Sequence, residues 1–508
     1  MSVVHADERG FELIGTAAEV REMDRRTIEG LGVPGRVLME LAGAGTAELI
    51  ARRLGGGAGG KAVVLCGGGN NGGDGYVIAR HLVDHGMSAR CVATTDVADL
   101  SGDARANADL WVALGGEVRV ATKGATAAMR NWLGHANVVV DALFGTGLSR
   151  DITGPAAELI AMANEARHGL KVAVDVPSGV DATTGAAYEP AFQADLTATF
   201  GVLKAGLLTS PGAELAGEVA VVGIAMPRSV VHEVGATYRR ATPAAIGGLV
   251  PPRPGSGHKG TFGHVGVIGG FAGKDGAGRL ASRAALRIGA GLVTWCTPAS
   301  APEREPEIMH HDVREGLPER PTVLVVGPGL GLDDAAREAL DLALADGRPL
   351  VLDADALNAL AARDMAANAE GHVVTPHPAE AGRLLGSSAK EVEADRLSAA
   401  EALVGLTRAV VVLKGARTIV AAPGEPAVLF ERPAPALAAG GTGDVLAGAI
   451  AGLMAQGLAP RDAALLAVFC HAEAGRATGL DQADRGVLAS EVADALPAAM
   501  AHLTTGWT

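Results

Sequence analysis

The sequence predicts an α/β protein built from two tandem domains, and three observations carry this prediction. The chain has 508 residues, more than the roughly 250–300 that one hydrophobic core usually spans. Short valine-rich runs, typical of buried parallel strands, alternate with alanine-rich stretches that favour helices. The proline cluster LVPPRPGSG (249–257) interrupts this alternation. We therefore expect one domain at residues 1–235 and a second at 236–508.

The first half is expected to form a doubly wound parallel sheet that is covered by helices on both faces. A helical pattern lies between residues 12 and 54 and ends at a glycine-rich stretch. Five strand-like runs follow, and most of them break into a loop of Gly, Asp or Ser residues. In such sheets the ligand binds at the carboxyl ends of the strands, so these loops are the candidate sites. The runs are 61–75, 137–147, 171–181, 196–201 and 218–224.

The same pattern restarts after the proline cluster and predicts a second parallel sheet. Each run again ends in a polar or glycine-rich loop. In the apolar segment at about 445–455, the spacing of Gly448 and Gly452 indicates close helix packing inside a core. The strand-like runs of this half are 263–270, 291–298, 322–331, 348–358, 372–380 and 409–418.

Composition excludes several classes of partner. The net charge of −14, the 3% aromatic content and the absence of a basic run predict no nucleic-acid partner. No signal-peptide pattern opens the chain, and no apolar run reaches the length of a bilayer, so we expect no membrane partner. Widely spaced cysteines without a C-x-x-C pair favour a reducing, cytoplasmic location. The cysteines are Cys66, Cys91, Cys296 and Cys470.

The loop GGGNNGGDG (67–75) is the first candidate site. Its glycines let backbone amides approach an anion, and we expect a helix to follow at 76–85. The loop formally satisfies G-x-G-x-x-G, with Asp96 about 20 residues farther on, so a dinucleotide site is one interpretation. Its Asn and Asp side chains add oxygen ligands that a pyrophosphate turn does not need. These ligands point to a polar substrate or a hard cation.

Two further loops of the first half share this chemistry. Asp141, Asp175 and Ser178 each follow a predicted strand, and each one alone could simply cap a helix. Three such loops together favour a site. Asn71, Asp141 and Ser178 offer the oxygen donors that a hard cation requires. Asp175 is a candidate base and Lys204 a candidate acid or charge stabiliser, unless Lys204 lies exposed on the surface.

Five ordered motifs resemble the YjeF N-terminal family, the NAD(P)H-hydrate epimerases. They are LMELAGAG (38–45), GGGNNGGDG (67–75), DALFGTGL (141–148), VDVPSGVDA (174–182) and TFGVLKAG (199–206). The resemblance covers about 12–228 and implies a Rossmann-like, three-layer domain that interconverts the R and S forms of NAD(P)H hydrate. It implies K⁺ near Asn71, Asp141 and Ser178. The implied substrate contacts are Asn70, Asn71, Gly72, Gly73, Asp74, Gly145, Thr146, Gly147, Leu148, Ser149 and Asp175.

In the second half, the segment 438–457 carries an anion-binding signature. Gly440, Gly441 and Gly443 precede a predicted helix, so their amides and the helix dipole can hold a phosphoryl group. Asp444 can accept a hydroxyl proton there, although an Asp at a helix start is often only a favourable charge. Lys414 to Thr418 (KGART) can neutralise nucleotide phosphate unless Lys414 faces solvent. We interpret Asp353 and Asp355 as loop or phosphate-side residues.

The second half resembles the YjeF C-terminal, ribokinase-like family, the NAD(P)H-hydrate dehydratases, over about 245–500. The motifs are HKGTFGHVGVIGG (258–270), AALRIGAGLV (284–293), VGPGLG (326–331), LDADALN (352–358), TPHPAE (375–380), VVLKGA (411–416) and GGTGDVLAG (440–448). The resemblance implies a ribokinase-like domain that uses ADP or ATP with Mg²⁺ to dehydrate the S hydrate, and it suggests a homo-oligomer. The implied hydrate contacts are Ala277, Gly329, His377 and Asp444, and the implied nucleotide contacts are Lys414, Gly415, Ala416, Arg417, Thr418 and Gly443. The charged loop FAGKDGAG (271–278) departs from the expected pattern around Ala277.

Taken together, the two halves predict a bifunctional isomerase and lyase that repairs hydrated nicotinamide cofactors. A stereospecific dehydratase would leave one epimer unrepaired, and a fused epimerase converts that epimer into the substrate of the dehydratase. Two alternatives stay open. One is a ribokinase-like small-molecule kinase with an N-terminal dinucleotide-binding module, and the other is a non-enzymatic dinucleotide sensor.

Overall fold

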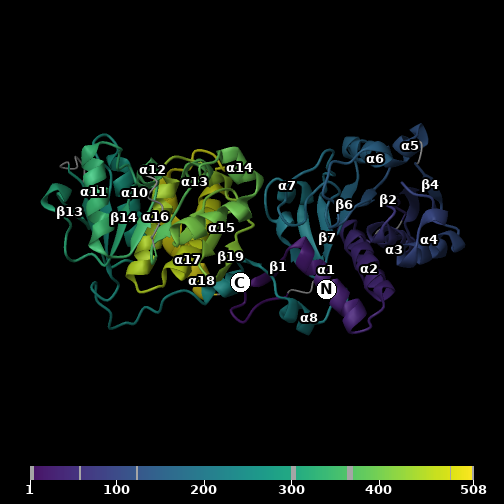
Figure 1. Ribbon diagram of the computed structural model, residues 1–508, viewed down its shortest axis with the longest axis horizontal. Coiled ribbons are helices and arrows are strands. Elements are labelled where there is room, and N and C mark those ends of the chain that lie inside the picture. Colours follow the sequence, from purple (N-terminus) through teal and green to yellow (C-terminus); the bar gives the residue numbers. More distant parts are fainter. Residues whose placement is uncertain are drawn as a thin grey trace. The chain divides into compact units, whose positions relative to one another are not determined.

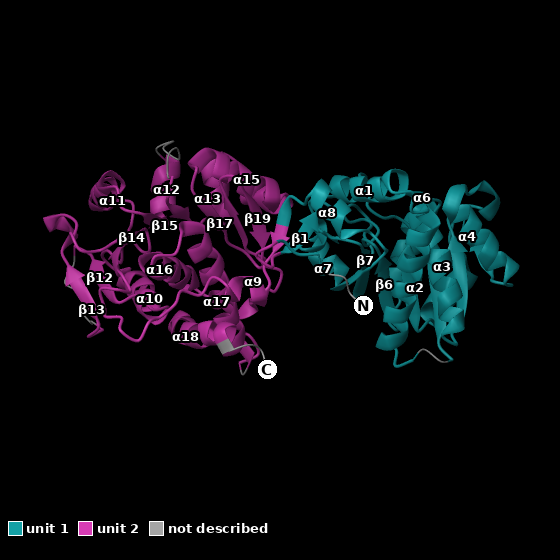
Figure 2. Ribbon diagram, turned by 90° about the horizontal axis from the view of Figure 1, so that it is seen from below, with its two compact units in different colours: residues 1–7, 12–238 teal, residues 8–11, 239–508 magenta. Residues whose placement is uncertain are grey.

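The computed structural model describes residues 5–56, 59–121, 124–298, 305–362, 370–480 and 482–505 (Figure 1). The chain divides into two compact units, which Figure 2 shows in different colours. The first unit holds residues 12–238 and the segment up to Asp7, and the second holds Glu8–Phe11 and residues from Arg239 onward. The division falls within β10 (Tyr238–Arg240).

The first unit is built on a parallel sheet with the strand order β4-β3-β2-β5-β6-β7-β9. The order reverses between β2 and β5, and ligands bind at such a switch point. The loops after β2 and β5 therefore lie where a site is expected. A separate short pair joins β1 (Glu12–Gly15) to β8 (Leu203–Lys204). The strands of the sheet are β2 (Lys61–Cys66), β3 (Ser88–Ala93), β4 (Val118–Val120), β5 (Val138–Ala142), β6 (Leu170–Val174), β7 (Leu196–Phe200) and β9 (Glu218–Val222).

Helices cover both faces of this sheet, which confirms the predicted three-layer fold. Alternate residues of β2 point to opposite faces. Val64 packs in one core cluster with Ile78, and Val63 packs in another with Leu159. Figure 1 shows α5 and α6 on one side of the sheet and α2, α3 and α4 on the other. The helices are α1 (Ala17–Arg25), α2 (Gly35–Arg53), α3 (Asn70–Asp84), α4 (Gly102–Ala113), α5 (Ala127–Gly134), α6 (Gly154–Glu165), α7 (Gly212–Ala216) and α8 (Arg228–Val234).

The second unit is built on a sheet with the order β13-β12-β11-β14-β15-β16-β17-β18-β19. The strands from β13 to β17 are parallel, and β18 and β19 add an antiparallel hairpin. The six strand-like runs of the sequence correspond to β11, β12 and β14 to β17, whereas β13 and the hairpin were not predicted. The strands are β11 (His264–Ile268), β12 (Leu292–Cys296), β13 (Ile308–His311), β14 (Val323–Val326), β15 (Leu350–Leu352), β16 (Val373–Val374), β17 (Val410–Leu413), β18 (Ile419–Ala422) and β19 (Glu425–Leu429).

Figure 2 shows this sheet between α11, α12, α13 and α15 on one side and α10, α16, α17 and α18 on the other. The glycines of α16 let it pack closely on α10, as the sequence predicted. A Cβ atom at Gly448 would lie 2.0 Å from the carbonyl oxygen of Ala281. The helices are α9 (Pro243–Gly247), α10 (Asp275–Arg287), α11 (Asp334–Asp346), α12 (Asp355–Ala362), α13 (Pro378–Leu385), α14 (Ala389–Ala394), α15 (Arg396–Thr407), α16 (Thr442–Ala455), α17 (Pro460–Leu480) and α18 (Ala489–Thr505). Within the described ranges, none of these helices or those of the first unit is both long and apolar enough to span a membrane.

Candidate active sites

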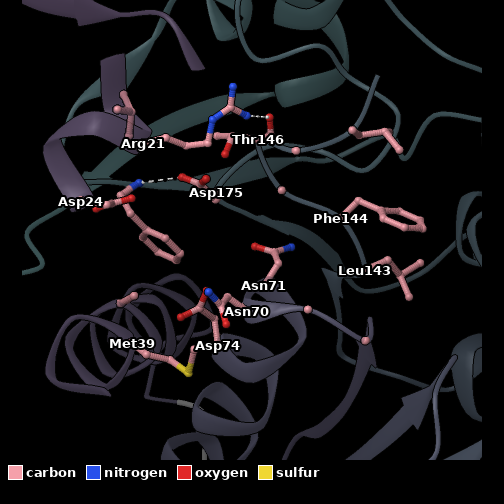
Figure 3. A pocket seen from close by; sticks show the side chains of 18 of the residues that line it. Arg21, Asp24, Met39, Asn70, Asn71, Asp74, Leu143, Phe144, Thr146 and Asp175 are labelled. Atoms are coloured by element: carbon pink, nitrogen blue, oxygen red, sulfur yellow. Dashed lines mark hydrogen bonds between the residues drawn. The ribbon is translucent and has the colours of Figure 1, made fainter. Parts of the chain in front are cut away.

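A cavity of about 1170 Å³ opens in the first unit (Figure 3). Its walls come from the loops after β2, β5 and β6 and from α1 and α2. The cavity thus brings together residues that lie far apart in the sequence. Most of the substrate contacts that the resemblance implied line it. These are Asn70, Asn71, Asp74, Gly145, Thr146, Gly147, Leu148, Ser149 and Asp175.

The helix α3 begins at Asn70, six residues earlier than the sequence predicted. Gly72 and Gly73 therefore lie buried inside its first turns, behind the cavity wall. Glycine is required at 72, because a Cβ atom there would lie 2.0 Å from the carbonyl oxygen of Gly67. This close approach turns the chain directly from β2 into α3, and the helix N-terminus then faces the cavity, where it favours a negative charge.

Asp175 and Lys204 form an ion pair at the cavity wall. The Lys204 Nζ donates to Asp175 Oδ1 at 2.5 Å and to the carbonyl oxygen of Phe200 at 2.7 Å. The Lys204 side chain is only 1% exposed, so the alternative of a surface lysine is wrong. Asp175 has a φ of +67°, a left-handed conformation that is rare outside glycine and is often found at functional sites.

Asp24 on α1 and Asp74 on α3 also line this cavity, and the charges of Asp175 and Lys204 act on both. Burial raises the pKa of Asp24 to about 6, with Lys204 lowering it and Asp175 raising it. Burial also raises the pKa of Asp74 well above its usual range, and Asp175 and Asp24 add to this effect. Asp24 was not predicted from the sequence, because it lies within an ordinary charged helical stretch that carries no motif.

The three residues expected to bind K⁺ lie where the loop after β5 meets the loop after β6. The Ser178 amide donates to Asp141 Oδ2, and its hydroxyl donates to Asp141 Oδ1, each at 2.7 Å. Burial raises the pKa of Asp141 to about 6, although the Ser178 hydrogen bonds oppose this. Asn71 lines the cavity nearby, and a Cβ atom at Gly145 would lie 3.3 Å from its Oδ1. These oxygen atoms fit a hard cation. Among the described residues, no cluster of three or more His, Cys, Asp or Glu side chains could hold a metal ion.

In the second unit, α16 begins at Thr442, directly after Gly441, which has a φ of +91°. Asp444 therefore lies in the first turn of the helix, as the sequence predicted. Burial raises the pKa of Asp444 to about 7, with Asp353 raising it further and Lys414 lowering it. A carboxyl group with such a pKa can both accept and return a proton near neutral pH.

Lys414 lies beside this helix start and is held by two acids. Its Nζ lies 2.6 Å from Asp353 Oδ1 and 3.8 Å from Glu380 Oε2. Burial opposes the charge of Lys414, but Asp353 and Glu380 outweigh it, so its pKa is raised. A Cβ atom at Gly443 would lie 3.5 Å from the Lys414 Nζ, so the lysine lies against the glycine-rich segment at the start of α16. Lys414 thus does not face bulk solvent.

The turn at 415–418 connects β17 to β18 and exposes Gly415 and Ala416. Arg396, which is 4% exposed, holds this turn in place. Its guanidinium donates to the carbonyl oxygens of Leu413, Lys414 and Arg417. The sequence did not predict Arg396 and Glu380, because the contacts that tie them to this site join distant segments. Arg396 donates to the carbonyl oxygen of Leu413, 17 positions away, and Glu380 pairs with Lys414 from another strand end.

The remaining predicted residues of this unit lie in two places. Gly329 has a φ of +59°, and a Cβ atom there would lie 3.0 Å from the Cβ of Ala277, so these two residues are adjacent. His377 is the N-cap of α13, and its Nδ1 accepts from the amides of Ala379 and Glu380. Its Nε2 lies 3.3 Å from Glu380 Oε1. Glu380 therefore links His377 to Lys414.

Family models match both units. The model described as NAD(P)H-hydrate dehydratase matches residues 265–498, and the model described as YjeF-related protein N-terminus matches residues 35–206. A structure of the ADP/ATP-dependent NAD(P)H-hydrate dehydratase from Bacillus subtilis, co-crystallised with ATP and Mg²⁺, aligns with a TM-score of 0.46 and 29% identity over 52% of this chain and 97% of that chain.

Curated relatives match almost the entire chain. The bifunctional NAD(P)H-hydrate repair enzyme Nnr of Moorella thermoacetica is 38% identical over 96% of this chain and 96% of that protein. The enzyme of the same name from Thermofilum pendens is 35% identical over 96% of each, and that of Escherichia coli K12 is 37% identical over 83% of this chain and 81% of that protein. The chain therefore belongs to the family of bifunctional NAD(P)H-hydrate repair enzymes.

Proposed function

We propose that this protein repairs hydrated nicotinamide cofactors in two steps. The first unit interconverts the R and S epimers of NAD(P)H hydrate, and the second removes water from the S epimer with ADP, releasing NAD(P)H, AMP and phosphate. The observation that carries this proposal is that each unit holds its own buried lysine–carboxylate pair. Lys204 lies 2.5 Å from Asp175, and Lys414 lies 2.6 Å from Asp353. Two such sites in one chain suit two successive reactions.

In the second unit, the chemistry follows from the anion site at α16. Asp444 accepts the proton of the substrate hydroxyl as its oxygen attacks the terminal phosphoryl group of the nucleotide. The amides of the helix start and Lys414 stabilise the charge on that phosphoryl group. The lone pair of the ring nitrogen then forms a C=N bond as the C–O bond breaks and phosphate leaves. The neighbouring ring carbon loses a proton to solvent, and the electron pair of that C–H bond forms the C=C bond of NAD(P)H. A hydroxide would leave far less readily, so phosphorylation makes the dehydration possible.

One group of residues in this second site binds the hydrate, and another binds the nucleotide. Ala277, Gly329 and His377 contact the hydrate together with Asp444. Ala277 of α10 is adjacent to Gly329, and Glu380 links His377 to Lys414 beside the start of α16. The turn after β17 contacts the nucleotide, and its members are Lys414, Gly415, Ala416, Arg417 and Thr418, with Gly443. Mg²⁺ supplies positive charge to the nucleotide phosphates when it is bound.

In the first unit, the cavity holds the hydrate against the start of α3 and the 145–149 loop. Asp175 accepts a proton from the substrate, and Lys204 stabilises its charge, since the ammonium is buried against Oδ1. Asn71, Asp141 and Ser178 would hold K⁺, whose charge supports the loops that line the cavity. We further propose that the protein works as a homo-oligomer in the cytoplasm, where its four buried cysteines stay reduced.

The proposal is tested by incubating the protein with ADP and a mixed pool of R and S hydrate while the absorbance of the restored dihydropyridine is followed. The wild-type protein is expected to convert the whole pool. Asp444→Asn is expected to stop dehydration while epimers still interconvert, as measured by chiral chromatography without ADP. No recovery of NAD(P)H, together with a stable phosphorylated alcohol, would instead identify a small-molecule kinase.

A further inference from the structure

We propose that Asp24 is the proton donor of the first unit and works opposite Asp175 as a second catalytic carboxyl group. This inference rests on the proposed epimerase function of the same cavity, and it names a residue that no motif of the sequence marks. Moving a hydroxyl group from one face of the ring to the other requires one group that accepts a proton and one that donates it. The structure offers few candidates for the donor.

The placement of Asp24 is fixed by α1. Thr16 caps this helix, because its hydroxyl accepts from the Glu19 amide and the Glu19 carboxylate accepts from the Thr16 amide. Residues three apart share one face of an α-helix, so Arg21 and Asp24 lie on one face of α1, and Ile28 follows in the π-helical segment Arg26–Gly30. All three line the cavity. Figure 3 shows Asp24 on the same side of the cavity as Asp175.

Lys204 is poorly suited to donate the proton. It is only 1% exposed, and its Nζ already donates to Asp175 Oδ1 and to the Phe200 carbonyl oxygen. Losing its proton would break the ion pair and leave a buried carboxylate without its counter-charge. Lys204 therefore serves to hold the charge of Asp175. Oδ1 of Asp175 also accepts from the Phe200 amide at 3.1 Å, so Oδ2 is the oxygen left for the substrate.

Asp24 has the opposite character. Among the described residues, no hydrogen bond or ion pair engages its carboxyl group. Burial raises its pKa to about 6, and the field of Asp175 supports this while Lys204 opposes it. The group therefore keeps its proton closer to neutral pH than an ordinary Asp does. The other charged groups that line the cavity are Arg21 on α1, Asp74 on α3, Asp103 on α4, Arg150 and Asp151 after β5, and the Asp175–Lys204 pair.

Asp74 is the other carboxyl group whose pKa the charge of Asp175 raises, but it fits less well. It is only 8% exposed and is almost surrounded by α3 and its neighbours, so the charged form is strongly disfavoured. A group that gives up its proton must also carry the resulting charge for part of the cycle. Asp24 can do so because it is less buried and its pKa lies closer to the working pH.

The reaction balances with these two groups. Asp175 takes the proton of the ring hydroxyl, and the O–H electron pair forms a C=O bond. The bond between this carbon and the ring nitrogen breaks, and its electron pair goes to the nitrogen, which takes the proton of Asp24. Rotation about the neighbouring C–C bond presents the other face of the aldehyde. The nitrogen then attacks that face, its proton returns to Asp24, and the oxygen recovers its proton from Asp175.

The test compares Asp24→Asn with Asp24→Glu in the full-length protein. Asparagine keeps the shape of the uncharged side chain but has no acidic proton, and we expect it to lower kcat for epimerisation by roughly 100-fold or more. In the wild-type protein, kcat/KM should fall as pH rises through about 6, and this limb should be absent in Asp24→Asn. Asp24→Glu is expected to recover part of the rate. Glu29→Gln, an exposed change one turn farther along the helical segment, is the matched control.

Dehydration of purified S hydrate by the second unit, together with the unfolding transition, shows that each variant is folded. The inference is overturned if folded Asp24→Asn epimerises within about threefold of the wild-type rate, far short of the loss of a general acid, or keeps the same pH limb. A wild-type protein that does not exceed the spontaneous rate of epimerisation would instead overturn the proposed function. The two failures are therefore distinguishable.

Discussion

Lys414 and Asp353 lie 61 positions apart in the sequence, yet the Nζ of one lies 2.6 Å from the Oδ1 of the other. Thr375 donates to the same carboxylate oxygen at 2.8 Å. The Asp353 side chain is only 2% exposed, so its negative charge depends on these two partners. In turn, Asp353 fixes the position of the lysine beside the start of α16.

Asp353→Asn should therefore impair dehydration without affecting epimerisation. Breaking a buried ion pair typically costs several kcal/mol, and we expect kcat/KM for ADP to fall at least roughly tenfold. Steady-state kinetics on S hydrate with varied ADP measures this effect. Asp334→Asn, a fully exposed change at the start of α11, is the control. Unchanged ADP kinetics in a folded Asp353→Asn protein would show that the pair plays no part in the reaction.

The dehydration rate should depend on the ionisation of Asp444. Its pKa is raised to about 7, and the group acts as a base, so kcat/KM should rise with pH and level off above about 7. Lys414 lowers this pKa, and Lys414→Gln should shift the rising limb to higher pH as well as reduce the rate. A pH–rate profile for both proteins measures the shift. A flat wild-type profile between pH 6 and 8 would argue against Asp444 as the base.

Ser178→Ala should weaken the binding of K⁺ and slow epimerisation. The Ser178 hydroxyl donates to Asp141 and accepts from the Phe144 amide at 2.9 Å, so its loss leaves the Phe144 amide without this acceptor and removes one of the hydrogen bonds that hold Asp141. Unsatisfied buried groups cost about 1–3 kcal/mol each. We expect at least roughly a tenfold lower rate and a higher half-saturating K⁺ concentration, as measured by titration of KCl at constant ionic strength. Ser88→Ala, at the exposed start of β3, should behave like the wild type.

Gly72→Ala should destabilise the first unit, whereas Gly69→Ala should not. A Cβ atom at 72 would lie 2.0 Å from a backbone oxygen, but one at 69 would meet nothing within 4 Å. Overpacking of this kind costs about 1–3 kcal/mol. Urea denaturation and hydrogen exchange of the α3 amides measure the difference. Equal stability of the two variants would mean that the turn after β2 adapts more freely than its geometry indicates.

The sequence predicted most strands of the parallel sheets, because buried strands are marked by local runs of valine, but it missed β3, β4 and β13. It placed the start of α3 too late, because Gly and Asn residues have low helix propensity and the packing of α3 on β2 overrides it. It missed the β18–β19 hairpin, since the run AVVVLKGART reads as one strand and loop.

The residues of the candidate sites were also predicted only in part. Motif residues such as Asn71, Asp175 and Asp444 could be named from glycine-rich loops at strand ends. The burial of Lys204 and the roles of Asp24 and Asp353 could not, because they depend on contacts between distant segments. From the sequence alone, an Asp within a helix is expected to be exposed to solvent, and only the fold shows that it lines a cavity.

The left-handed backbone of Asp175 has a practical consequence for mutagenesis. Of the 20 residues, glycine, asparagine and aspartate adopt a φ near +67° most readily. Alanine scanning at this position would therefore confound two losses, that of the carboxylate and that of a tolerated backbone geometry. Asparagine removes the charge but keeps the shape of the side chain and the backbone conformation. Glycine removes the whole side chain and keeps the backbone conformation. A saturation library should thus contain three well-folded members, of which only the aspartate is an active epimerase.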